Sequence, residues 1–267
     1  MFNKQFFNGS NGKISYVKID GENSFPTIVF LDGFGGANNY LGLKNIAKRI
    51  DQRYTKLFID RLGVCESDET DVPRTWDNIV FEIHELLENL IIKSVIFFAH
   101  SASGPLALAY SHVYPNEVLG LIGIEPTTKM GDILFQTEEY KQAIAWMSKL
   151  SVEERNQIFI DPEWSEKERL EEQLTAKHLI EGSTLFNEYV MGQKNLESIS
   201  NLPKNPQLPI LLFLQPFRHK EYRTSEYAGN MTTYILMEGN HYLHRVHPDE
   251  VANQVDHWLN LNVPYNR

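Results

Sequence analysis

The sequence predicts an α/β protein with a mostly parallel β-sheet flanked by helices. Short apolar segments typical of buried strands alternate along the 267-residue chain with longer segments whose apolar residues recur at helical spacing. This alternation indicates parallel strands joined by crossover helices, which cover both faces of the sheet. Between residues 127 and 206 the alternation stops, and the sequence becomes helical and charged. We therefore expect one core, formed by residues 1–126 and 207–267, that carries an inserted helical cap, residues 127–206.

Each core element has its own signal in the sequence. Two short segments at residues 4–7 and 13–19, separated by the turn-forming letters NGSNG, predict two strands joined by a turn. Helices are predicted where apolar residues recur three or four positions apart, as at Leu43, Ile46 and Ile50. The remaining predicted elements, in chain order, are a strand at 25–31 that ends in a glycine-rich turn, a helix at 39–50, a strand at 54–60, a helix at 76–92, a strand at 95–99, a helix starting near 102, a strand at 118–125, and, beyond the cap, strands at 208–215 and 232–238 and a last helix at 248–261.

Composition narrows the range of partners and compartments. The net charge of −10, without a basic cluster, argues against nucleic acid and anionic membrane surfaces as partners. No apolar run approaches the ~20 residues needed to cross a bilayer, and the N-terminal letters lack the layout of a signal peptide. The single cysteine, Cys65, fits a reducing compartment. Paired Cys/His spacings typical of zinc sites are missing. We expect a cytoplasmic protein without metal or cofactor, and the oligomeric state stays open.

Ser101 lies where a strand passes into a helix without an intervening loop. Such a corner presents its residue above the sheet and requires small neighbours, because bulky ones would collide with the adjoining strand and helix. The neighbours here are Ala99, Ala102, Ser103 and Gly104. This arrangement resembles the nucleophile elbow, G-x-S-x-G, of the α/β-hydrolase superfamily, with Ala99 and Ser103 in place of two glycines. The alternative is a serine that only caps the following helix.

Two further segments strengthen this resemblance, which implies the α/β-hydrolase fold. The segment FLDGFGG is similar to the family's H-G-x-G loop, with Asp32 where a histidine is usual. The resemblance implies that the backbone N–H groups of Phe34 and Ala102 form an oxyanion hole. The segment DRLGVCESD resembles the family's D-x-x-G-x-G-x-S pattern. We interpret Cys65, which replaces a glycine there, as a small packed residue rather than a nucleophile.

A histidine follows the last predicted strand. The segment MEGNHYLHRVHPDEVANQVDHWL resembles the family's final strand, histidine loop and C-terminal helix, and the resemblance puts His241 at the position of the catalytic base. We interpret His247, which precedes Pro248, as a turn residue and His244 as packed beneath the loop. An imidazole bonded to Ser101 would accept its proton and make a weak nucleophile reactive.

The acid that orients His241 has two main candidates. Most family members carry it after the next-to-last strand, where the loop QPFRHKEYRTSEY has no aspartate but offers Glu221. Some members place it after the preceding strand, where LIGIEPTT supplies Glu125. A carboxylate that ends an apolar strand needs a partner because burying an unpaired charge is costly, so we favour Glu125. We expect it within hydrogen-bonding distance of His241 Nδ1, raising the pKa of that histidine, and we expect Glu221 to be solvated.

A serine at the elbow argues against the haloalkane dehalogenase and epoxide hydrolase branches, which use an aspartate nucleophile. We expect a serine hydrolase that cleaves a small, largely apolar carboxylic ester through Ser101, His241, Glu125 and an acyl-enzyme. A C–C bond hydrolase or thioesterase of the same fold stays open. So does a ligand-binding protein on an impaired scaffold, because the elbow and Asp32 depart from the family's motifs. Apolar side chains of the predicted cap indicate a substrate group of modest size: Phe135, Trp146, Met147, Phe159, Trp164, Phe186 and Tyr189.

Overall fold

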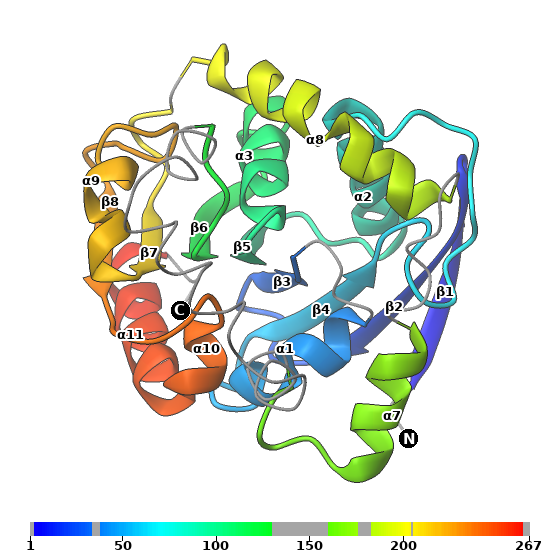
Figure 1. The fold of residues 1–267 in the computed structure, drawn as a ribbon, viewed down its shortest axis with the longest axis horizontal. Helices are drawn as coiled ribbons and strands as arrows, with labels where there is room; N and C mark the ends of the chain where they lie inside the picture. The colour runs from blue at the N-terminus through cyan, green and yellow to red at the C-terminus, as the bar shows by residue number, and fades with distance from the viewer. Residues whose placement is uncertain (1–2, 34–37, 130–159, 176–182, 204, 264–267) are drawn as a thin grey trace, which may run out of the picture.

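A computed structural model describes residues 3–33, 38–129, 160–175, 183–203 and 205–263 (Figure 1). It confirms the predicted architecture, because these residues form an eight-stranded, mostly parallel sheet flanked by helices. The strands are β1 (Lys4–Gly9), β2 (Gly12–Ile19), β3 (Thr27–Leu31), β4 (Thr55–Asp60), β5 (Val95–His100), β6 (Val118–Ile124), β7 (Ile210–Leu214) and β8 (Thr232–Leu236). The described helices are α1 (Asn39–Ala47), α2 (Trp76–Asn89), α3 (Ser103–Val113), α7 (Glu166–Thr175), α8 (Thr184–Ser200), the 3-10 turn η2 (Pro216–Arg218), α9 (His219–Tyr222), α10 (Leu243–Val246) and α11 (Pro248–Asn262).

The strand order determines which chain segments meet. The strands lie in the order β1-β2-β4-β3-β5-β6-β7-β8. β2 pairs antiparallel with both β1 and β4, whereas every pairing from β4 through β8 is parallel. The carboxyl ends of these parallel strands therefore share one edge of the sheet, and ligands bind at that edge in open α/β sheets.

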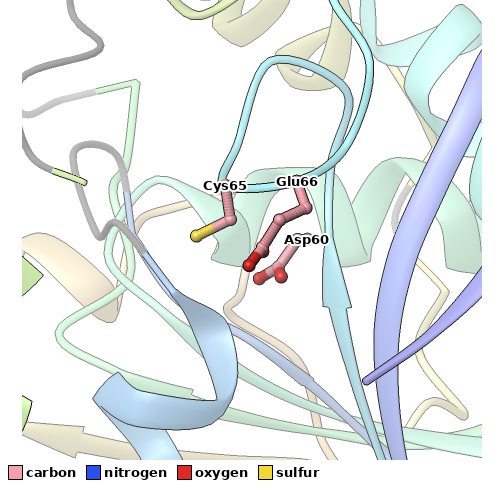
Figure 2. A group of neighbouring side chains, drawn as sticks. All are labelled: Asp60, Cys65 and Glu66. Atoms are coloured by element: carbon pink, nitrogen blue, oxygen red, sulfur yellow. The ribbon is translucent and has the colours of Figure 1, made fainter. Parts of the chain in front are cut away.

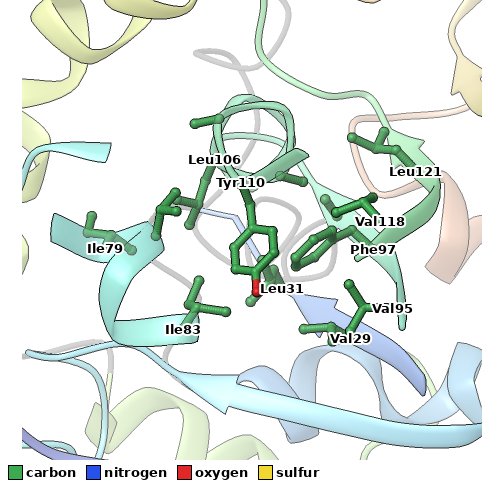
Figure 3. Packing of buried hydrophobic residues seen from close by; sticks show 14 of the residues in the cluster. Val29, Leu31, Ile79, Ile83, Val95, Phe97, Leu106, Tyr110, Val118 and Leu121 are labelled. Atoms are coloured by element: carbon green, nitrogen blue, oxygen red, sulfur yellow. The ribbon is translucent and has the colours of Figure 1, made fainter. Parts of the chain in front are cut away.

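Both faces of the sheet are buried, as its apolar central strands require. Along β3, Val29 and Leu31 pack with residues of α2 and α3, as Figure 3 shows from close by. Ile28 and Phe30 point to the opposite face and pack with residues of α1 and α11. This alternation follows from the two-residue period of a strand. The central strands are thereby packed on both faces, and this packing fixes where the loops at their carboxyl ends begin.

The structure differs from the expected elements in a few short segments. The helix predicted at 76–92 ends at Asn89, two residues before Ile91 with its φ of 58°. The loop expected after β7 contains η2 and α9, and the histidine loop contains α10. Helices of three or four residues are too short to leave a periodic signal in the sequence.

Two described helices, α7 and α8, lie between β6 and β7, within the segment predicted to be a cap. Most of the predicted cap's remaining residues, among them Phe135, Trp146, Met147 and Phe159, lie outside the described residues, and the cap boundaries stay a prediction. Among the helices of the described residues, none combines the length and apolar character that crossing a membrane requires.

Candidate active site

Ser101 occupies the corner between β5 and α3. Its φ of 51° lies in the left-handed region that residues with a Cβ rarely adopt. Its N–H donates to the carbonyl of Ile124 over 3.1 Å, and its own carbonyl accepts from the N–H groups of Gly104 and Thr127. A Cβ at Gly33 would lie 2.9 Å from the Cβ of Ser101, so only a glycine allows the neighbouring loop to approach this closely. Ala102, and not Ser101, takes the N-cap position of α3.

The two departures from the elbow pattern have structural reasons. Ala99 is fully buried in the core cluster on the α2 and α3 face, where a methyl group is accommodated. The hydroxyl of Ser103 is also buried and donates to the carbonyl oxygen of Asp32, which also lies 3.5 Å from a guanidinium nitrogen of Arg61. Ser103 thus holds the loop that follows β3, a contact that a glycine could not supply.

Glu125 lies directly after β6, beside the corner that carries Ser101. Its side chain is 1% exposed, and its Oε2 is 3.7 Å from Nδ1 of His241, whose ring is 40% exposed. This distance describes an ion pair and exceeds the expected hydrogen bond. Glu125 Oε2 also accepts from Arg218 over 2.7 Å and from the side chain of Gln215 over 3.1 Å. These two donors draw the carboxylate oxygen away from the histidine.

The loop after β7, where the family usually carries its acid, provides donors instead. The backbone N–H of Gln215 donates to Glu125 Oε1 over 2.6 Å, and the N–H of Glu125 donates to the carbonyl of Phe213. Burial opposes ionisation, but the interaction with His241 and the charge of Arg218 outweigh it and lower the pKa of Glu125 to about 2. Glu125 is therefore a carboxylate at neutral pH, held by the loop from which the usual aspartate is missing.

Glu221 does not lie in a solvated loop, so that expectation is wrong. Its side chain is 4% exposed, pairs with Arg218 and accepts from the hydroxyl of Thr128. No contact between Glu221 and His241 is found among the described side chains. A guanidinium has enough donors to serve both carboxylates at once, so Arg218 links Glu221 to Glu125.

The expected rise of the pKa of His241 is also wrong. The ring is partly withdrawn from water, and this desolvation, with repulsion from His100 and Arg218, outweighs the attraction of Glu125 and lowers the pKa of His241 below its ordinary value of 6.5. The neutral ring is thereby favoured, which is the form that accepts a proton. The competing histidines lie as expected: His244 is 2% exposed, and Nε2 of His247 bonds to the carbonyl of Glu238 over 2.7 Å.

The two residues implied as oxyanion-hole donors differ in what can be described. Ala102 begins the turn into α3, directly after Ser101. Phe34 lies outside the described residues. Just before it, Asp32 is 4% exposed, accepts from the N–H of Gly33 over 2.7 Å and pairs with Nδ1 of His100 over 2.8 Å. Asp32 thus has a buried partner beside Ser101.

Cys65 lies in a small acidic group with Asp60 and Glu66 (Figure 2). The possible ligand atoms of the three residues lie within 4.8 Å of one another, a spacing that a cation could bridge. However, Asp60 accepts from Ser15 and from the backbone of Asn39, Glu66 pairs with Lys4, and burial raises the pKa of Asp60 to about 6. The protein's own donors satisfy these oxygens, so the group gives no indication of a metal.

Sequence reasoning missed three residues of this site, namely His100, Gln215 and Arg218. All three form hydrogen bonds to other residues of the site, and none lies at a position that a sequence motif identifies. A partial signal existed, because a histidine directly before Ser101 must be buried at the end of an apolar strand and therefore needs polar partners. Which partners those are depends on contacts across the sheet edge.

Curated relatives of this chain carry several hydrolase names. A stretch of 130 residues is 30% identical to a proline iminopeptidase of Heyndrickxia coagulans and covers 47% of this chain and 44% of that protein. The sn-1-specific diacylglycerol lipase ABHD11 of Danio rerio is 24% identical over 94% of this chain and 78% of that protein. A human (Lyso)-N-acylphosphatidylethanolamine lipase is 33% identical over 44% of this chain and 35% of that protein. The chain therefore spans less than half the length of two of these relatives.

Solved structures and a protein family agree on the fold. Smu.1393c from Streptococcus mutans superposes with a TM-score of 0.73 at 24% identity, covering 98% of this chain and 99% of that one. The haloalkane dehalogenase DbeA from Bradyrhizobium elkani gives a TM-score of 0.66 at 18% identity, covering 97% and 98%. Residues 26–218 match the family described as alpha/beta hydrolase fold. With most of its length matched, this chain belongs to the α/β-hydrolase fold family.

Proposed function

We propose that the protein is a serine hydrolase that cleaves a small, largely apolar carboxylic ester. Ser101 is the nucleophile, His241 the general base and Glu125 the acid that orients it. The observation that carries the proposal is the buried carboxylate of Glu125, 3.7 Å from Nδ1 of His241, at the sheet edge where Ser101 occupies a strained corner. Strained backbone and paired buried charges are both concentrated at functional sites.

In the proposed reaction, the hydroxyl oxygen of Ser101 attacks the ester carbonyl carbon while His241 takes the hydroxyl proton. The carbonyl oxygen becomes an oxyanion, which the N–H groups of Phe34 and Ala102 would stabilise. When this intermediate collapses, the bond to the alcohol oxygen breaks, and that oxygen leaves with the proton from His241. A water molecule, deprotonated by His241, then cleaves the acyl-enzyme, which releases the acid and restores Ser101.

Support for an acyl substrate comes from the relatives, because two of those compared are named lipases and one an iminopeptidase. Aromatic side chains of the predicted cap give weaker support. Trp164 is 3% exposed and donates to the carbonyl of Leu41, so it attaches the segment before α7 to α1. Tyr189 on α8 is 64% exposed. A thioesterase or C–C hydrolase would use the same serine and histidine.

A fluorophosphonate probe tests the proposal directly. Intact-protein mass spectrometry should detect one adduct, which is lost in Ser101→Ala and retained in Ser111→Ala. Ser111 is a suitable control because it lies on α3 and its hydroxyl bonds to the helix carbonyl of Leu108 over 2.8 Å. An adduct that survives Ser101→Ala would contradict the mechanism.

Turnover of a short p-nitrophenyl ester separates an enzyme from a binding protein on the same scaffold. We expect hydrolysis that disappears with Ser101→Ala. If the wild-type protein is folded but gives neither adduct nor turnover, the ligand-binding alternative replaces the proposed function.

A further inference from the structure

A buried pair of side chains, Asp32 and His100, lies beside the corner that carries Ser101. Asp32 follows β3, and His100 ends β5, the neighbouring strand. Nδ1 of His100 is 2.8 Å from Oδ1 of Asp32, and Nε2 is 3.1 Å from the backbone carbonyl oxygen of His241. The side chains of His100 and Asp32 are only 2% and 5% exposed. One imidazole therefore connects the loop after β3 with the loop that carries the proposed base.

The hydrogen-bond partners determine the protonation of His100. A carbonyl oxygen only accepts hydrogen bonds, so Nε2 of His100 must donate to the backbone carbonyl oxygen of His241. Oδ1 of Asp32 already accepts from the N–H of Gly33 over 2.7 Å, and Oδ2 lies 3.8 Å from the guanidinium of Arg245. The guanidinium charge beside Oδ2 favours the ionised form of Asp32, and a carboxylate has no proton to donate, so Nδ1 must donate as well. An imidazole that donates from both nitrogens is an imidazolium.

Three rings and one carboxylate surround His100. The rings of His241, Tyr242 and His244 lie 4.8, 4.9 and 5.0 Å from the ring of His100, centre to centre. Burial opposes ionisation of Asp32, but the hydrogen bond and charge of His100, with the charge of Arg245, hold the pKa of Asp32 well below its usual range. Asp32 is the carboxylate beside this ring, so its negative charge stabilises the imidazolium.

We propose that His100 is a positioning residue: as an imidazolium paired with Asp32, it fixes the backbone carbonyl of His241 and so aims the His241 ring at Glu125 and Ser101. Since the carbonyl and the ring belong to the same residue, holding the peptide plane limits where the ring can point. This role rests on the proposed function for its kinetic consequence. It also gives a reason for a carboxylate at position 32, because Asp32 there holds the second proton on His100.

Two substitutions of His100 separate its two hydrogen bonds. In His100→Gln the side-chain amide lies near the position of Nε2 and can still donate to the His241 carbonyl. In His100→Asn it lies near Nδ1 and can donate only to Asp32. We expect kcat for a p-nitrophenyl ester to fall about 10–100-fold in His100→Asn, with KM unchanged, and much less in His100→Gln. Equal losses, or the larger loss in His100→Gln, would overturn the proposal. His257→Gln, an exposed histidine of α11, is the control.

A measurement that does not depend on activity keeps the two proposals distinguishable. In the wild-type protein near neutral pH, ¹⁵N NMR should find both ring nitrogens of His100 protonated, and Asp32→Asn should remove one of these protons. The backbone carbonyl ¹³C signal of His241 should lose its hydrogen-bond shift in His100→Asn and keep it in His100→Gln, because only glutamine can still donate to that oxygen. A neutral His100 in the wild-type protein would overturn the inference even if Ser101 reacts with the phosphonate. If Ser101 does not react, the proposed function fails, and the NMR result still decides the role of His100.

Discussion

Ser101 and Glu125 have positive φ angles of 51° and 45° at the ends of neighbouring strands. Such angles cost on the order of 1–3 kcal/mol for a residue with a Cβ. Backbone bonds from Ser101 to Ile124 and from Glu125 to Phe213 help to hold both corners in this conformation. At these two positions we therefore expect the side chain to matter for chemistry more than for folding.

Replacing Glu125 tests this expectation. Glu125→Gln keeps the shape of the side chain but removes the charge that orients His241 and stabilises its protonated form. We expect kcat to fall on the order of 10⁴-fold, as for the comparable change in a serine protease. Arg218 keeps Glu221 as its partner, so the free energy of unfolding should fall by no more than about 1–3 kcal/mol, and the protein should stay folded in the assay. Ester turnover and a thermal melt of the same preparation measure both quantities.

Glu221→Gln is the matched comparison, and it should differ from Glu125→Gln in turnover. Arg218 is 11% exposed and makes two bonds to Glu221, of 3.0 and 2.9 Å. Weakening this buried pair should lower the free energy of unfolding by about 1–3 kcal/mol, and most of the turnover should remain. If Glu221→Gln instead loses turnover at unchanged stability, Glu221 is the acid and our choice of Glu125 is wrong.

The pH profile reports on His241. Its pKa lies below 6.5 in the folded protein, and the base must be neutral to accept a proton. We expect kcat/KM to be level near neutral pH and to fall only as the pH drops below about 6.5. Glu125, with a pKa of about 2, stays ionised throughout that range. A steep fall that starts above pH 7 would contradict the lowered pKa.

His241→Ala should lose nearly all turnover, whereas His244→Ala should keep a substantial part.

At the residue scale, the sequence was sufficient to bring Ser101, His241 and Glu125 forward as candidates, because each follows a recognisable strand. It could not predict the pairs Asp32–His100 and Arg218–Glu125. The members of each pair are far apart in the chain and meet only through the strand order. For the same reason, the burial of Glu221 could not be read from the charged letters around it.

At the scale of elements, a buried ion pair is among the described contacts that hold α8 to the core. Arg61, directly after β4, lies 3.0 Å from Glu188 of α8, and their side chains are 4% and 5% exposed. The same guanidinium donates to Ser103 over 3.2 Å. Arg61 therefore connects a helix of the predicted cap with the nucleophile corner.

Removing one partner of this pair should be costly. We expect Glu188→Ala to lower the free energy of unfolding by about 3–5 kcal/mol, because it leaves the charge of Arg61 buried without its carboxylate. Chemical denaturation measures the loss. Glu197→Ala, at an exposed position of the same helix, is the control and should cost far less. Equal effects of the two substitutions would mean that the ion pair contributes little.

The longer elements were predictable because they are either continuous apolar runs, as in buried strands, or segments whose apolar residues recur at helical spacing. The segment from Val95 to Val113 is the clearest case, with β5 passing into α3 at the predicted place. η2, α9 and α10 were not predicted, because tertiary contacts fix them. Examples are the bonds from Arg218 to Glu125 and from Tyr222 to the carbonyl of Pro126.

At the scale of the whole molecule, stability should depend on pH through histidines that folding buries. Burial and the charges of His100 and Arg245 hold the pKa of His244 well below its ordinary 6.5. The folded state then binds fewer protons than the unfolded chain below that pH, so stability falls as the pH drops through about 6.5. Asp60 acts in the opposite direction, because its raised pKa of about 6 contributes stability that is lost as pH rises toward that value.

A variant isolates the contribution of His244. We expect the thermal midpoint of His244→Phe to fall less than that of the wild-type protein when the pH is lowered from near neutral to about 5. Melts of both proteins at matched ionic strength measure the difference. Parallel curves would show that His244 does not titrate on unfolding as its buried position requires.

The backbone bond between Ser101 and Ile124 has a consequence for how such a protein can diversify. The proposed nucleophile and the proposed acid stand at adjacent corners of one strand–helix–strand unit, so their spacing is set within that unit. Glu125 is the first residue after β6, and the rest of the chain up to β7 contains neither of the two proposed residues. Changes in the length or sequence of this segment beyond Glu125 would therefore leave the spacing of the two proposed residues unchanged.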